Sequence, residues 1–405
     1  PIYIVSWLFA LAVSFVSCDD WLDKTPKDRL YPDVYFKTED ELRLFTNQFY
    51  NNLVPSAVDI YSESSDLIVK SDLMLEMSGQ RIIPDEGNGW NFTALRDINF
   101  YLQYSHNCTE VNARNRYDGV ARFFRAYFYF EKVKRYGDIP WYDKALDSDD
   151  PELYKARDSR EFVMQKMLED LDFAIANLPK TKNAYVLTRW TALALKSRVC
   201  LFEGTFRKYH GLEDYEKYLN ACVSASETFM NESGYTLYKS GSTPYRDLFA
   251  SINLQADEVI FGRDYEASLS VLHNVQNYEN STTMGRPGMN KKIVNSYLMA
   301  DGSRFTDKAG YETMTFDQEC QNRDPRLAQT IRTPGYTRIG STKKEAPNLA
   351  YTMTGYHLIK YSMTANYDEY NKSCNDIPLF RTAEVYLNFA EAKAELGTLK
   401  QADIN

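Results

Sequence analysis

The sequence is poor in the residues from which most catalytic and metal sites are built. It contains four histidines and six cysteines, and no two cysteines form a C-x-x-C pair. It also lacks the G-x-S-x-G, phosphate-loop and H-E-x-x-H motifs. These absences argue against a zinc site, a nucleotide-binding loop and the common serine hydrolases. We therefore predict a protein that is not an enzyme and uses no cofactor.

A surplus of basic residues is also missing. Lys and Arg total 47 against 56 Asp and Glu, for a net charge of −9, so a nucleic-acid partner is not expected. After residue 17 no apolar run approaches the roughly 20 residues of a membrane-spanning helix. The acidic segment 143–150 offers carboxylates to calcium, but it lacks the Gly turn and terminal Glu of an EF-hand loop. Calcium stays open and unsupported.

The N-terminal segment has the pattern of an export signal. Residues 2–16 form an uncharged, apolar run that ends at Ser17-Cys18 and is followed at once by Asp19 and Asp20. We predict a lipoprotein signal peptide over 1–17 and lipidation of Cys18, which would anchor the protein to a membrane. One acyl chain binds a membrane only marginally, so stable anchoring needs more than one. The alternatives are an ordinary cleaved signal with an incidental Cys18, or a weak anchor helix.

Helical periodicity is the strongest structural signal. Segments 122–137, 189–204 and 381–397 each open with Arg, contain small residues at close-packing positions and stop at Gly. Two of them are followed by a second amphipathic segment, at 161–178 and 215–230. Helix pairs of this kind predict a mainly α, tetratricopeptide-like scaffold of helical hairpins, with generic hairpins as the alternative.

The same periodicity predicts which helix faces are buried. In 381–397 the 3,4 spacing places one apolar stripe on the following residues: Phe380, Ala383, Leu387, Ala390 and Ala394. In 122–137 it assigns a set of polar and basic residues to the wetter face: Arg122, Arg125, Tyr129 and Lys132.

Composition divides the chain further. Helical patterns dominate residues 18–240, whereas 241–375 is rich in Gly, Pro, Asn and Tyr and dense in turn signals. We expect 241–375 to be a loop-rich ligand-binding insert on the helical scaffold. Residues 376–405 begin a C-terminal helical region.

Two loop stretches combine aromatic rings with amide and guanidinium groups. The apolar face of a sugar packs on aromatic rings, and its hydroxyls need paired donors and acceptors. The candidate ligand-binding residues of the first stretch are Arg81, Asn88, Trp90 and Asn91. Those of the second stretch are Tyr278, Asn280 and Arg286. For Trp90, burial that merely anchors the loop is the competing interpretation.

Six short motifs, in order, resemble the SusD-like (RagB) family of Bacteroidetes. They are Cys18-Asp-Asp-Trp-Leu-Asp23, Phe124-Arg-Ala-Tyr127 with Tyr136-Gly-Asp-Ile-Pro140, Arg189-Trp-Thr-Ala192, Asp301-Gly302, Arg323-Asp-Pro-Arg-Leu327, and Pro378-Leu-Phe-Arg-Thr-Ala-Glu384 leading to Phe389-Ala-Glu-Ala392. Each is weak alone, but together they span nearly the whole chain. These motifs belong to the scaffold, so they identify a family without identifying a ligand.

The resemblance implies a lipid-anchored protein on the extracellular face of the outer membrane. Such a protein captures a glycan or oligosaccharide nutrient and delivers it to a SusC-like, TonB-dependent barrel. Relatives continue beyond the segment 381–397, so we expect the C-terminal region to be incomplete at Asn405. Other functions stay open: a peptide or other nutrient as ligand, a structural partner that gates a barrel, or a helical glycoside hydrolase using Glu384 or Glu391.

Overall fold

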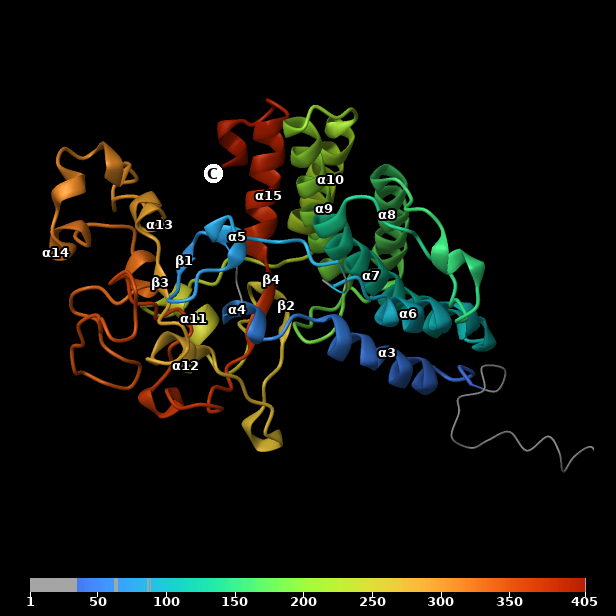
Figure 1. Cartoon of the computed structure of the whole chain (residues 1–405), viewed down its shortest axis with the longest axis horizontal. Helices are drawn as coiled ribbons and strands as arrows, with labels where there is room; N and C mark the ends of the chain where they lie inside the picture. Colours follow the sequence, from blue (N-terminus) through green and yellow to red (C-terminus); the bar gives the residue numbers. More distant parts are fainter. Residues whose placement is uncertain (1–34, 62–64, 86, 88, 405) are drawn as a thin grey trace, which may run out of the picture.

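The protein is mainly α-helical, as predicted, in a computed structural model that describes residues 35–61, 65–85, 87 and 89–404. The predicted signal peptide and Cys18 lie outside the described residues. In Figure 1 the long helices stand together on one side, and a segment of short helices and loops forms the other side.

The longer helices are α3 (Glu39–Leu53), α6 (Thr93–Tyr104), α7 (Val111–Tyr136), α8 (Arg160–Asn177), α9 (Arg189–Tyr209), α10 (Tyr215–Glu232) and α15 (Thr382–Glu395). The short helices are α4 (Val58–Tyr61), α5 (Leu75–Ser78), α11 (Pro244–Ala250), α12 (Val275–Glu279), α13 (Lys291–Ser296) and α14 (Phe316–Glu319). The strands are β1 (Ile68–Val69), β2 (Val259–Arg263), β3 (Gly288–Met289) and β4 (Ile377–Arg381).

The long helices pack in chain order, with α7 against α8, α8 against α9 and α9 against α10. α15 then packs against both α9 and α10. Polar caps fix where several helices begin: the side chains of Thr38, Ser159 and Thr188 accept hydrogen bonds from backbone N–H groups in the first turns of α3, α8 and α9. Buried aromatic side chains from α3, α6 and α7 fill much of the space between these helices.

The predicted end of the second helix at Gly204 is wrong, because α9 continues to Tyr209. Gly204 lies instead where α10 approaches most closely. A Cβ atom at this position would stand 2.7 Å from the Leu219 side chain and 3.1 Å from the Leu219 backbone N. The glycine therefore permits close helix packing.

Two predictions of buried faces are wrong in part, although Phe380 is buried and Arg122 and Lys132 are not, as predicted. In α7, Arg125 and Tyr129 are buried, because the guanidinium is neutralised by Asp170 and the phenol oxygen bonds to the backbone of residues 140 and 142. In α15 the buried apolar side chains are Val385, Phe389 and Ala392, whereas Leu387 is exposed. The face of α15 that is buried against α9 and α10 is therefore rotated about the helix axis from the predicted face.

Residues 251–376 contain only short helices, short strands and turns. β1 pairs with β3, and β2 pairs with β4, both antiparallel. β2 and β4 tie this segment to the helices, because Phe261 and Phe380 belong to the main hydrophobic core and β4 leads directly into α15.

A buried polar cluster, here called the Asn280 network, also holds this segment together. The Asn280 side chain donates to Ser362 Oγ at 3.0 Å and accepts from Arg332 at 3.2 Å and Arg338 at 3.3 Å. Ser362 Oγ in turn donates to Glu279 Oε2 at 2.7 Å. Buried polar groups with such partners add specific, directional contacts to a segment that has only small hydrophobic clusters.

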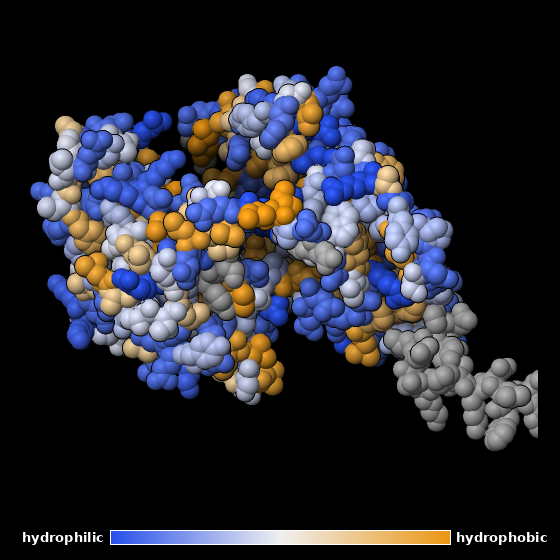
Figure 2. Space-filling model, in the orientation of Figure 1, coloured by the Kyte–Doolittle hydropathy of each residue, from blue (hydrophilic) through white to orange (hydrophobic). Residues whose placement is uncertain are grey.

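The surface carries apolar side chains near the middle of Figure 2, over α5. The exposed apolar residues between positions 67 and 83 are Leu67, Leu73, Leu75, Ile82 and Ile83.

The described cysteines are free and, apart from half-buried Cys320, buried. Among the described residues, no helix combines the length and the apolar character that crossing a bilayer requires.

Candidate functional site

Trp90 lies on a tight loop that precedes α6 in the chain and packs against α7. Its backbone N–H donates to Gly87 O at 2.9 Å, and both Gly87 and Gly89 adopt left-handed backbone conformations, with φ of 72° and 83°. A Cβ atom at Gly89 would lie 3.3 Å from the Tyr136 hydroxyl, so glycine permits the close approach to α7. The Lys132 ammonium donates to Gly89 O and ties the loop to the same helix.

The Trp90 ring is held by aromatic neighbours and is still partly open to solvent. It meets the Phe92 and Tyr136 rings edge-on at centroid distances of 5.3 and 4.9 Å. The Arg157 guanidinium carbon lies 5.0 Å from the centre of the Trp90 ring. The residue remains 40% exposed.

Trp90 lines a cavity of about 520 Å³, called here the Trp90 cavity. The other lining residues are Phe92, Thr93, Leu95, Arg96, Asn99, Pro140, Tyr142, Lys144, Leu146, Leu153, Lys155, Ala156 and Arg157. They come from α6, from the segment 140–146 that follows α7, and from the segment 153–157 that precedes α8. Aromatic surface and long cationic side chains therefore face one space.

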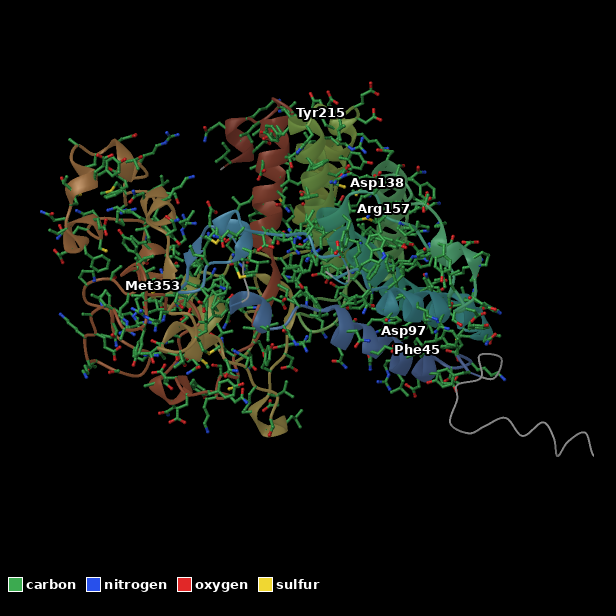
Figure 3. The ribbon with its side chains drawn as sticks, viewed as in Figure 1. Phe45, Asp97, Asp138, Arg157, Tyr215 and Met353 are labelled. Atoms are coloured by element: carbon green, nitrogen blue, oxygen red, sulfur yellow. The ribbon has the colours of Figure 1, made fainter. Side chains whose placement is uncertain are left out.

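A second cavity of about 770 Å³, the Asp97 cavity, adjoins the first, because Thr93 lines both. Its lining is more polar and includes Asn51, Asn52, Ser56, Asp59, Asn91, Asp97, Tyr127, Glu131, Lys132 and Arg263. Figure 3 labels Asp97 on α6 and Arg157 before α8, one residue from each cavity, on the helical side of the molecule. Amide, carboxylate and cationic groups give this second space both donors and acceptors.

Partial burial alters the acidity of groups in the Asp97 cavity. Burial raises the pKa of Asp97, and the nearby Arg96 charge opposes part of that shift. Burial lowers the pKa of Lys132, and the neighbouring Arg135 charge lowers it further. Burial also raises the pKa of the Tyr127 phenol. Each shift favours the neutral form, which donates hydrogen bonds in the carboxyl and phenol cases.

Buried hydrogen bonds behind the Trp90 cavity fix its wall. Asn99 donates to Tyr142 O at 2.8 Å and to Lys144 O at 3.3 Å, which anchors the segment 140–146 on α6. Arg125 donates to the Asn99 side-chain oxygen at 3.2 Å and forms a two-pronged ion pair with Asp170, at 2.6 and 2.7 Å. The wall thus rests on a charge pair that joins α7 to α8.

The first predicted stretch reaches the cavities in part. Trp90 lines one cavity and Asn91 the other, where the Asn91 side chain also accepts from Thr93 N at 2.8 Å. Arg81 lines neither cavity, and its nearest carboxylate is Glu76 at 3.6 Å. Asn88 lies outside the described residues.

The second predicted stretch lies elsewhere. Tyr278, Asn280 and Arg286 line neither cavity, so the structure does not bring the two stretches together. Tyr278 is buried, and the side chain of Asn280 is hydrogen-bonded within the Asn280 network. Arg286 has its guanidinium bonded to the carbonyl oxygens of Leu349 and Ala350, at 2.7 and 2.9 Å. In this conformation all three side chains are occupied within the protein.

Several cavity residues escaped the sequence analysis. Arg96, Tyr142, Lys155 and Arg157 carry no motif or composition signal that separates them from ordinary helix and loop residues. Lys144 falls within the acidic segment 143–150, which drew attention for calcium instead. Among the described residues no group of three or more His, Cys, Asp or Glu side chains converges as metal ligands would.

The carboxylates of the hydrolase alternative, Glu384 and Glu391, lie away from both cavities. Glu384 pairs with Arg198 at 2.5 and 2.7 Å, and this pair links α15 to α9. Glu395 accepts from Lys208 and Tyr209. Neither these residues nor Glu391 line the Trp90 cavity or the Asp97 cavity.

Two family models match the chain. One, described as "SusD family", matches residues 248–405, and the other, described as "Starch-binding associating with outer membrane", matches residues 79–189. SusD-like protein P2 of Formosa agariphila is 25% identical over 95% of this chain and 76% of its own length.

Solved structures share the fold. A SusD-like carbohydrate-binding protein of Bacteroides fragilis superposes with a TM-score of 0.70 at 18% identity, over 91% of this chain and 76% of that one. A crystal structure determined with a xylogluco-oligosaccharide superposes with a TM-score of 0.59 at 18% identity, over 87% and 70%. At these identities the likeness concerns the fold. Together with the family models, it places the protein among helical, SusD-like scaffolds. The two family models, the curated relatives and the structural neighbours all support the SusD-like family for this chain.

Proposed function

We propose that the protein binds a glycan, with the Trp90 cavity and the adjoining Asp97 cavity as its site. The observation that carries the proposal is the partly exposed Trp90 ring at the wall of a space rich in hydrogen-bonding side chains. A sugar ring packs its apolar face on such an indole, and its hydroxyls find donors and acceptors next to it. The names of the two structural neighbours support a carbohydrate ligand.

We further propose that Cys18 carries the lipid anchor and that the protein works at the extracellular face of the outer membrane. The description of the family model that matches residues 79–189 supports this location. A SusC-like, TonB-dependent barrel is the proposed recipient of the glycan. Under this proposal the protein performs no chemistry on its ligand. A Cys18→Ala variant expressed from its natural promoter should leave the membrane fraction.

The contribution of Trp90 can be sized from its exposure. A Trp side chain offers up to about 250 Å², and its exposed part is 40%. If a sugar covers half of that, about 50 Å² is buried, worth roughly 1.3 kcal/mol or a tenfold change in Kd. Loss of Trp90 should therefore weaken glycan binding about tenfold.

The test is calorimetry with a panel of oligosaccharides and oligopeptides on the wild-type protein and Trp90→Ala. Tyr370→Ala is the matched control, since Tyr370 is 68% exposed and lines neither cavity. Trp90→Phe keeps an aromatic ring and should bind with intermediate affinity. Unchanged glycan affinity in Trp90→Ala, or binding of oligopeptides alone, would contradict the proposal.

A further inference from the structure

The charged residues that line the Trp90 cavity are all basic. They are Arg96, Lys144, Lys155 and Arg157, and among the described residues no Asp or Glu side chain lines this cavity. The chain as a whole has more acidic than basic residues, with a net charge of −9. An all-basic lining is therefore a local feature of the cavity.

The four cations differ in how far they are neutralised. Lys144 lies 3.1 Å from Glu152, and Lys155 lies 3.0 Å from Asp158, so both have a carboxylate partner. Among the described residues, the hydrogen bond of the Arg96 side chain goes to the Leu146 carbonyl oxygen, at 3.2 Å. Within the described part of the chain, neither Arg96 nor Arg157 has a carboxylate within 4.0 Å.

These two guanidinium groups are placed to meet a ligand. Arg157 stands over the Trp90 ring, so a sugar in contact with that ring carries its substituents next to a cation. Arg96 is on α6, one residue before Asp97, whose side chain faces the second cavity. A guanidinium group presents parallel N–H donors that match the two oxygens of a carboxylate or sulfate.

We infer that the glycan carries a negatively charged group, a carboxylate or a sulfate ester, which binds in the Trp90 cavity between Arg96 and Arg157. This inference rests on the proposed glycan-binding function and names the ligand class. The lining of the Asp97 cavity mixes acidic residues (Asp59, Asp97, Glu131) with the basic Lys132 and Arg263, and this cavity takes an uncharged part of the same ligand. The all-basic lining of one cavity and the mixed lining of the other therefore also set the direction in which the glycan chain lies.

The test compares matched ligands that differ only in charge. Oligogalacturonate and its fully methyl-esterified form make the carboxylate arm, and a sulfated galactan oligosaccharide and its desulfated form make the sulfate arm. Affinities are measured with wild-type protein, Arg96→Ala, Arg157→Ala and Lys343→Ala. Lys343 is an exposed lysine that lines neither cavity, so its variant controls for net charge.

In at least one arm the Kd of the charged ligand should be lower than that of its neutral partner by a factor of about ten or more. One charge-assisted hydrogen bond typically contributes this much. Each arginine variant should lose about tenfold for the charged ligand and little for the neutral one, whereas Lys343→Ala should match wild type. The preference should also weaken at high salt because ions screen partly exposed charges. Both arginines are exposed, so their variants should keep the wild-type thermal midpoint.

The outcomes separate this inference from the proposed function. If neutral partners bind as tightly as charged ones and Trp90→Ala still weakens them, the inference is overturned and glycan binding stands. A charge preference that survives in both arginine variants also overturns it, because the anion is then recognised elsewhere. If no glycan of either charge binds, both the inference and the proposed function are overturned.

Discussion

Replacing Asp170 with alanine would leave a cation buried between α7 and α8. The Asp170 side chain is 3% exposed and accepts both prongs of Arg125, which is itself 9% exposed in its side chain. After the change, the strongest remaining contacts of Arg125 are the Asn99 oxygen at 3.2 Å and the Trp141 ring at 5.1 Å. Neither contact carries a full negative charge, so the guanidinium stays largely uncompensated.

The expected cost is about 3–5 kcal/mol of unfolding free energy, the usual result of removing one partner from a buried ion pair. Asp172→Ala is the matched control on the same helix. Asp172 is 60% exposed and pairs with Lys196 at the surface, so its loss should cost at most about 1 kcal/mol. Removing both buried charges, with leucine at positions 125 and 170, should recover most of the stability lost in Asp170→Ala.

Urea unfolding followed by circular dichroism measures the global cost. Hydrogen exchange supplies a local readout, because Asn99 should lose its orientation and release the backbone of residues 140–146 at the Trp90 cavity. The reasoning is refuted if Asp170→Ala and Asp172→Ala cost the same, or if the double variant is no more stable than Asp170→Ala.

Two further changes probe other parts of the fold. Gly204→Ala should lower the unfolding free energy by about 1–3 kcal/mol, because the new methyl group would overlap Leu219. Gly119→Ala should cost less in the same urea-unfolding assay, since its added atom would lie 3.4 Å from its nearest neighbour. Burial raises the pKa of Glu279 to about 7 from 4.5, so its proton stabilises the fold fully below pH 4.5 and that stability is lost as the pH rises through 7. Glu279→Gln should remove this pH dependence, which is on the order of 3 kcal/mol. The measurement is the urea midpoint of wild type and of Glu279→Gln at pH 5 and at pH 8. An equal change of the midpoint in both proteins would contradict the prediction.

Much of the helical scaffold could be predicted from periodicity, but its boundaries and faces could not. The segments around Arg189 and Tyr215 are helices in the structure, whereas α7 begins at Val111, well before the predicted start at Arg122. Residues 111–121 are polar and contain Gly119, so their pattern carries little apolar signal. Arg125 appeared to belong on a wet face because periodicity takes no account of a carboxylate partner on another helix.

The candidate site was predictable only where the local sequence is unusual. Trp90 between Gly89 and Asn91 is such a place, and the structure lines a cavity with it. Asn280 and Arg286 have equally suitable side chains, but these are bonded within the protein. Composition alone does not distinguish a polar group reserved for a ligand from one that holds loops together. Arg157 reaches the Trp90 cavity through the chain's path in space, which no local pattern encodes.

The Asn280 network has a consequence for how this scaffold can diversify. One amide joins the chain near residues 280, 332, 338 and 362 from the inside, through side chains that are all buried. The outer turns of these segments contribute nothing to those bonds. The sequences and lengths of these outer turns can therefore change while the buried hydrogen bonds of the Asn280 network are kept. The surface of this segment can acquire new properties without a change of fold.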